Sequence, residues 1–144
     1  MNTHIIPAFT PMVAVAAVLI AFVFILLFSL IKEPVRQKVS ALLIAGAGAV
    51  YWSGGLGAFE FAFGSVMIFI AYKGLTKYYF IGIGWMLHTG WDILHHLYGN
   101  PIVPMEASSS LGCAICDPII ALWYFFNAPT IFYLFRKTTN IKVS

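Results

Sequence analysis

The sequence has few charged residues. Its 144 residues include eight Lys and Arg and five Asp and Glu, which together make up 9% of the chain. About a quarter of the residues in a soluble globular domain are charged, whereas here 61% of the residues are hydrophobic. This composition excludes an ordinary soluble domain and predicts an integral membrane protein. The net charge of +3 does not indicate nucleic-acid binding, because the basic residues fall between and after apolar runs, where they set membrane topology.

Linkers, internal repeats and low-complexity segments are absent as well, so we expect a single domain over residues 1–144. Cysteine and histidine are scarce, with two and four residues respectively. Membrane enzymes that form disulfides with a quinone use two cysteine pairs, and the histidine boxes of membrane desaturases need more histidines than this chain has. Neither class of enzyme fits the sequence.

Long apolar runs predict an all-α membrane protein with about five transmembrane helices in one bundle. The clearest run, from Pro11 to Ile31, would extend about 31 Å as a helix, close to the hydrocarbon thickness of about 30 Å. A short polar connector, which contains Lys32 and Pro34, follows this run. The five predicted spans cover residues 11–31, 35–53, 56–72, 79–98 and 118–135.

The start of the last helix is ambiguous. Asp117 followed by Pro118 is typical of an N-cap and the first helical residue, which would leave residues 99–116 as an outer loop or re-entrant segment. Alternatively, the helix begins near Ser109 and Pro118 kinks it. We expect the first arrangement.

The basic residues predict the orientation of the chain. Five spans place all eight of them on one side of the membrane, as the positive-inside rule requires. The N-terminus is then outside and the C-terminus inside, in a multi-pass protein of the cell membrane, the inner membrane in a bacterium. Glu60, His95 and His96 fall in the outer half. The basic residues are Lys32, Arg36, Lys38, Lys73, Lys77, Arg136, Lys137 and Lys142.

Small residues recur every four positions in the second predicted helix, at Ala41, Ala45, Ala49 and Ser53. Such a stripe lets another helix approach closely in lipid. The expected partners are therefore membrane lipids and a second copy of the chain, which would pack through faces of this kind.

The segment Trp85 to Gly99, WMLHTGWDILHHLYG, carries the strongest functional signal. At helical spacing, His88, Asp92, His95 and His96 share one face about 100° wide. Ionisable groups inside a membrane mark ion pathways or catalytic sites. A hydrogen-bonded network that only fixes helix packing is the structural alternative.

Histidine with carboxylate favours a divalent transition metal such as zinc or iron. His88 and His95 are separated by about 10.5 Å of helical rise, so one ion cannot bind the whole face. Asp92 could share an ion with His96 or with His88, and the remaining ligands would come from His95, or from Glu60 and Asp117 on other helices. His88 and Asp92 are the expected catalytic residues, with His88 orienting groups or transferring protons.

Cys113 and Cys116 form a CxxC motif within SSSLGCAICDP. Near a helix N-terminus such a pair can be redox-active, can supply part of a metal site, or can form a structural disulfide. Inert thiols are a further alternative, and the motif alone does not decide among them.

The segments GWMLHTGWDILHHLYGNPIVP and SSSLGCAICDP resemble a family of small bacterial integral-membrane proteins of unknown function. The resemblance implies a membrane protein and no particular activity. From the residues, we expect a metal-dependent enzyme that acts on a lipid or small amphiphile. The alternatives are a proton- or cation-coupled transport or binding protein, and a structural membrane subunit with a polar packing network.

Overall fold

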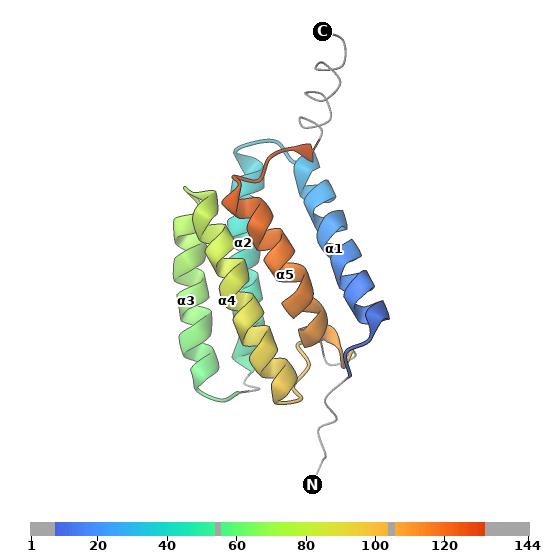
Figure 1. Cartoon of the computed structure of the whole chain (residues 1–144). Coiled ribbons are helices and arrows are strands. Elements are labelled where there is room, and N and C mark those ends of the chain that lie inside the picture. Colours follow the sequence, from blue (N-terminus) through green and yellow to red (C-terminus); the bar gives the residue numbers. More distant parts are fainter. Residues whose placement is uncertain (1–7, 54–55, 104–105, 132–144) are drawn as a thin grey trace.

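The computed structural model describes residues 8–53, 56–103 and 106–131, and these form a bundle of five α-helices (Figure 1). The predicted all-α fold with five helices is therefore confirmed. A 3-10 turn, η1, extends the second helix. The elements are α1 (Pro11–Leu30), α2 (Val35–Val50), η1 (Tyr51–Ser53), α3 (Phe59–Gly74), α4 (Tyr78–Leu97) and α5 (Ser109–Phe125).

Consecutive helices run in opposite directions, and α4 lies between α3 and α5 (Figure 1). α2 packs against α3 and α4, while α1 packs mainly against α5. The buried face of α1 repeats every four residues and is narrow, because it consists of Ala17, Ala21, Ile25 and Ser29. Small residues thus bring α1 close to the rest of the bundle, as expected where helices pack in lipid.

α2 approaches α3 closely at Gly48. A Cβ atom added there would lie 2.4 Å from the Cβ of Met67. Of the predicted small-residue stripe on α2, Ala41 is fully buried whereas Ala49 is exposed, so the stripe does not lie in a single environment. The proposed second copy of the chain stays a prediction.

The last helix begins at Ser109, so the expected start at Pro118, with Asp117 as its N-cap, was wrong, and the alternative start near Ser109 was right. Pro118 lies inside α5. The side chains of Ser109 and Ser110 accept hydrogen bonds from the backbone N–H groups of Val103 and Ile102, at 3.0 and 3.2 Å. These bonds tie the preceding loop to the first turn of α5. α5 ends at Phe125, so the expected continuation of this helix beyond that residue was wrong, and residue 135 itself lies outside the described residues.

Only α1, within the described part of the chain, is both long and apolar enough to cross a membrane by length and composition. α5 is apolar but has 17 residues. Each of the five helices nevertheless exposes large hydrophobic side chains, for example Phe22 on α1, Leu42 on α2 and Phe69 on α3. The buried residues include Glu60 and Asp92, both with no exposed surface. Large apolar side chains are therefore exposed on the outside of the bundle, and several ionisable side chains are buried beside its apolar core.

Candidate metal centre

The centre of the candidate site is His88 on α4. One turn later on the same helix, Asp92 places its Oδ2 atom 2.9 Å from His88 Nδ1. Asp117 on α5 brings its own Oδ2 atom within 2.7 Å of the same nitrogen. All three side chains are buried, with exposed fractions of 6%, 0% and 3% for His88, Asp92 and Asp117. Because α5 begins at Ser109, Asp117 lies in the third turn of the helix and faces α4.

Tyr51 completes this group from the 3-10 turn after α2. Its hydroxyl lies 3.1 Å from His88 Nε2 and donates a short hydrogen bond to Asp92 Oδ1. Tyr51 is 1% exposed. The sequence did not single out Tyr51, because a tyrosine at a helix end beside Trp52 is typical of the aromatic belt at a membrane surface. The available signal was its position at the same predicted depth as the polar face.

This group contains more hydrogen-bond acceptor atoms than hydrogen-bond donors. Ionised carboxylates only accept hydrogen bonds, and two of them face one imidazole and one phenol hydroxyl. Asp92 Oδ2 is close to His88 Nδ1 but outside hydrogen-bond geometry, and it has no other partner among the described residues. A buried group with excess negative charge needs a cation, either protons or a metal ion.

The geometry suits a metal ion. Among the described residues, His88, Asp92 and Asp117 are the only group of three or more His, Cys, Asp or Glu residues whose potential ligand atoms lie within 4.8 Å of one another. Metal–ligand bonds of about 2.0–2.2 Å hold ligand atoms at separations of this order. One imidazole with two carboxylates is a donor set for zinc, iron or manganese.

Glu60 and His95 form a second buried pair. Glu60 Oε1 accepts a hydrogen bond of 2.7 Å from the backbone N–H of Leu56 and lies 2.9 Å from His95 Nε2. The other ring nitrogen of His95, Nδ1, is 3.2 Å from the carbonyl oxygen of Asn100. The ring of Tyr51 contacts both histidines, with centroid distances of 5.2 Å to His88 and 4.9 Å to His95.

The structure thus brings together some of the expected metal ligands and separates others. Asp92 and Asp117 converge on His88, which the sequence analysis treated mainly as a proton-transfer residue. His95 and Glu60 pair with each other instead. His96 is half-buried, and its Nδ1 atom has no hydrogen-bond partner within the described chain.

The two cysteines are free thiols on α5. Cys116 is buried and Cys113 is half-buried. Cys113 precedes Asp117 by one helical turn and so lies on the same face of α5. The disulfide alternative is not realised in this structure, and the inert, redox and metal alternatives stay open.

One family model matches residues 12–130, and its description is a family of unknown function, DUF6010. The chain belongs to the DUF6010 family. No curated protein and no solved structure gives a significant match. The matched region contains every residue of the buried polar groups in this DUF6010 protein: Tyr51, Glu60, His88, Asp92, His95 and Asp117.

Proposed function

We propose that this DUF6010 protein is a multi-pass protein of the cell membrane, with five helices that cross the bilayer. The support is its inverted polarity, because large apolar side chains are exposed on each helix while carboxylates and imidazoles are buried. In water such a surface would drive aggregation, whereas in lipid it is the stable arrangement. The helices of 16 or 17 residues, α2, α3 and α5, are near the lower limit for a span.

Within this bundle we infer a centre for a divalent transition metal, zinc or iron, held by His88, Asp92 and Asp117. The observation that carries this proposal is the convergence of one imidazole and two carboxylates, from two helices, in a fully buried place. A bound divalent cation would offset the excess negative charge, and His88 would bind it in its neutral form. Such an ion would supply Lewis-acid chemistry or activate a water molecule.

The proposed activity is a reaction on a lipid or small amphiphile. An apolar groove of about 390 Å³ lies beside the site and is lined by Leu56, Phe59, Trp91, Leu94 and Tyr98. Trp91 links this groove to the site, because its ring contacts that of Tyr51 at a centroid distance of 6.5 Å. The groove would hold an acyl or isoprenoid chain, and the Tyr51 hydroxyl would donate or accept the proton at the reacting group.

Metal analysis of the purified protein tests this proposal. Wild-type protein prepared without chelator should contain about one transition-metal ion per chain. Asp92→Asn preserves the shape of the side chain but removes its charge, so it should lose the metal while the protein stays folded in detergent. Glu106→Gln is the matched control, because Glu106 is an exposed carboxylate in the loop before α5, and its metal content should equal that of the wild type. Wild-type protein without stoichiometric metal would overturn the proposal.

A proton pathway is the second candidate, and a separate observation favours it. Asp117, His88, Tyr51, His95 and Glu60 follow one another in contact from α5 to α3. Such a line of titratable groups can transfer protons within a bundle. This function predicts proton flux into liposomes from metal-free protein, and Glu60→Gln should abolish the flux.

A further inference from the structure

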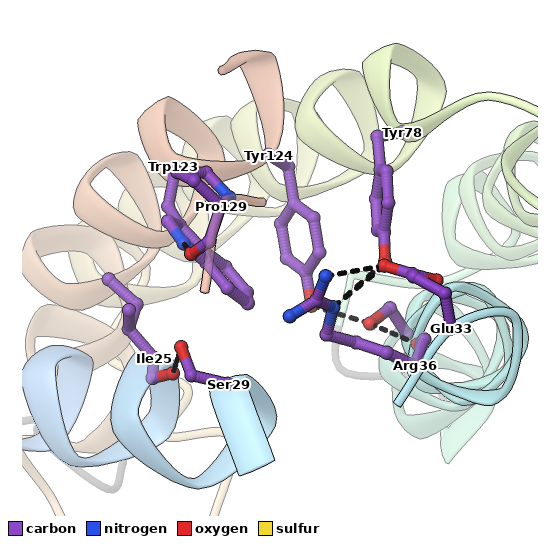
Figure 2. A network of polar contacts seen from close by, with 9 residues as sticks. Ile25, Ser29, Glu33, Arg36, Tyr78, Trp123, Tyr124 and Pro129 are labelled. Atoms are coloured by element: carbon purple, nitrogen blue, oxygen red, sulfur yellow. Dashed lines mark hydrogen bonds and ion pairs between the residues drawn. The ribbon is translucent and has the colours of Figure 1, made fainter. Parts of the chain in front are cut away.

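A second polar cluster (Figure 2) lies at the end of the bundle where α1 leads into α2 (Figure 1). Arg36, in the first turn of α2, donates hydrogen bonds to Glu33 Oε1 from Nε at 2.9 Å and from Nη2 at 2.5 Å. Arg36 Nε also donates to the hydroxyl oxygen of Tyr78, at 3.1 Å. The Tyr78 hydroxyl itself donates to Glu33 at 2.6 Å. This cluster is distinct from the candidate metal centre in position and in charge.

One nitrogen of Arg36 has no partner. The residue is 6% exposed, and its Nη1 atom is buried without a hydrogen-bond partner in the described part of the chain. Figure 2 shows one terminal guanidinium nitrogen that points away from Tyr78, toward the side where Trp123 and Ser29 lie. Buried donors in folded proteins are nearly always satisfied, and those on a charged group are the most costly to leave without a partner. This nitrogen therefore needs an acceptor that the described residues do not supply.

The surroundings of this nitrogen are mainly apolar. The ring of Trp123 lies 6.0 Å from Arg36 Cζ, and Ile25 is among the buried residues on the facing side. The nearby polar groups already use their hydrogens, because Ser29 donates to Ile25, Trp123 to Pro129 and Tyr124 to Ser40 (Figure 2). Nη1 is the only buried side-chain nitrogen or oxygen without a hydrogen-bond partner among the residues drawn in Figure 2.

We propose that Arg36 binds an anionic oxygen in the headgroup of a lipid, with the apolar part of that lipid beside Trp123 and α1. A guanidinium pairs well with phosphate and carboxylate oxygens. Free phosphate would need donors for all its oxygens, and the apolar walls do not supply them. An amphiphile presents one charged end and an apolar body, as this place requires. The inference rests on the proposed membrane location and not on the metal.

The charge at this end of the bundle favours the same ligand. Lys32, Lys38 and Lys77 are exposed there, and within the described part of the chain Glu33 is the only acidic residue with which Arg36 pairs. Basic residues near the ends of membrane helices attract anionic headgroups. The lysines would raise the local lipid concentration, and Arg36 would provide the specific contact.

Native mass spectrometry of the whole protein in detergent micelles tests the inference. Phosphatidylglycerol and phosphatidylcholine are the lipid probes, and inorganic phosphate is the free-anion probe. We expect one phosphatidylglycerol per chain to bind tightly, with about tenfold weaker binding in Arg36→Gln because a charge-assisted hydrogen bond is lost. Lys38→Gln is the matched control, since it removes the same charge from an exposed position on the same helix. Its affinity should change less than twofold.

Three results would overturn the inference. They are equal binding by the wild type and Arg36→Gln, an equal loss in Lys38→Gln, and competition by inorganic phosphate at the same affinity as the lipid. If Arg36→Gln does not fold, Arg36→Lys keeps the charge but lacks the second terminal nitrogen, and it should also bind more weakly. Extraction of the protein from membranes tests the proposed location separately, and metal content tests the other site.

Discussion

Tyr51 joins the two buried polar groups, namely the group around His88 and the pair of His95 with Glu60. Its hydroxyl contacts His88 and Asp92, and its ring contacts His88 and His95. A buried carboxylate is stable only when donors or a cation satisfy it. Tyr51 supplies one of these donors to Asp92, so the hydroxyl matters for the stability of the bundle whether or not a metal binds.

We therefore expect Tyr51→Phe to lower the free energy of unfolding by about 1–3 kcal/mol, because Asp92 loses a buried donor. Thermal unfolding in detergent measures the effect. Tyr79→Phe is the control, since Tyr79 is exposed and its hydroxyl makes no hydrogen bond to the described residues. Equal unfolding temperatures for Tyr51→Phe and the wild type would show that the hydroxyl does not stabilise Asp92.

Glu33, at the end of the bundle where α2 begins, predicts that the stability of the fold depends on pH. Burial raises the pKa of its carboxyl group, but hydrogen bonds from Tyr78 and Arg36 outweigh burial and hold the pKa below the ordinary value of 4.5. A lowered pKa in the folded state adds stability above the ordinary pKa, and this stability is lost as the pH falls through the lowered pKa.

The stability difference between the wild type and Glu33→Gln should thus be positive near neutral pH and disappear in acid, below the lowered pKa. The difference is expected to be less than about 1 kcal/mol, because the side chain is 45% exposed and solvent screens the pair. Thermal unfolding at a series of pH values measures it. A difference that stays constant down to acid pH would contradict this assignment.

At the scale of helices, the sequence predicted four of the five starts well and failed at α5. Asp117 and Pro118 have the local pattern of a helix start. In the structure Asp117 instead forms a tertiary contact with His88, and Ser109 and Ser110 bind the preceding loop. Such contacts between separate segments have no local signal. Because the start of the last helix was mispredicted, the convergence of Asp117 with His88 and Asp92 was not predicted either.

Helix packing makes a prediction about two glycines of α2. In Gly48→Ala the new methyl group would lie too close to Met67 Cβ, which is fixed to the backbone of α3. We expect a loss of about 1–3 kcal/mol in the free energy of unfolding from this overpacking. Gly46→Ala meets no atom within 4 Å, and better helix propensity should stabilise it by up to about 1 kcal/mol. Opposite shifts in unfolding temperature are the expected result, and equal shifts would contradict the close approach of α2 and α3.

At the scale of the whole molecule, the two ends of the bundle carry different kinds of charged side chains. The end where α2 begins and α3 ends carries Lys32, Arg36, Lys38 and Lys73, whereas Glu60 and His95 lie in the half where α4 ends (Figure 1). Composition and charge order along the chain were enough to predict this division. They could not predict which side chains meet inside, because helix rotation and depth depend on packing.

This division leads to a prediction about topology. A reporter that is active only outside the inner membrane should work when fused in the loop at Glu106, and a reporter that fluoresces only inside should work when fused at the α3–α4 turn, near Lys77. The physical reason is that Lys and Arg near span ends stay on the cytoplasmic side. Exchanging the two reporters provides the control, since both should then fail. If both positions report the same side, α4 does not cross the bilayer, and the proposed arrangement of five membrane-crossing helices is wrong.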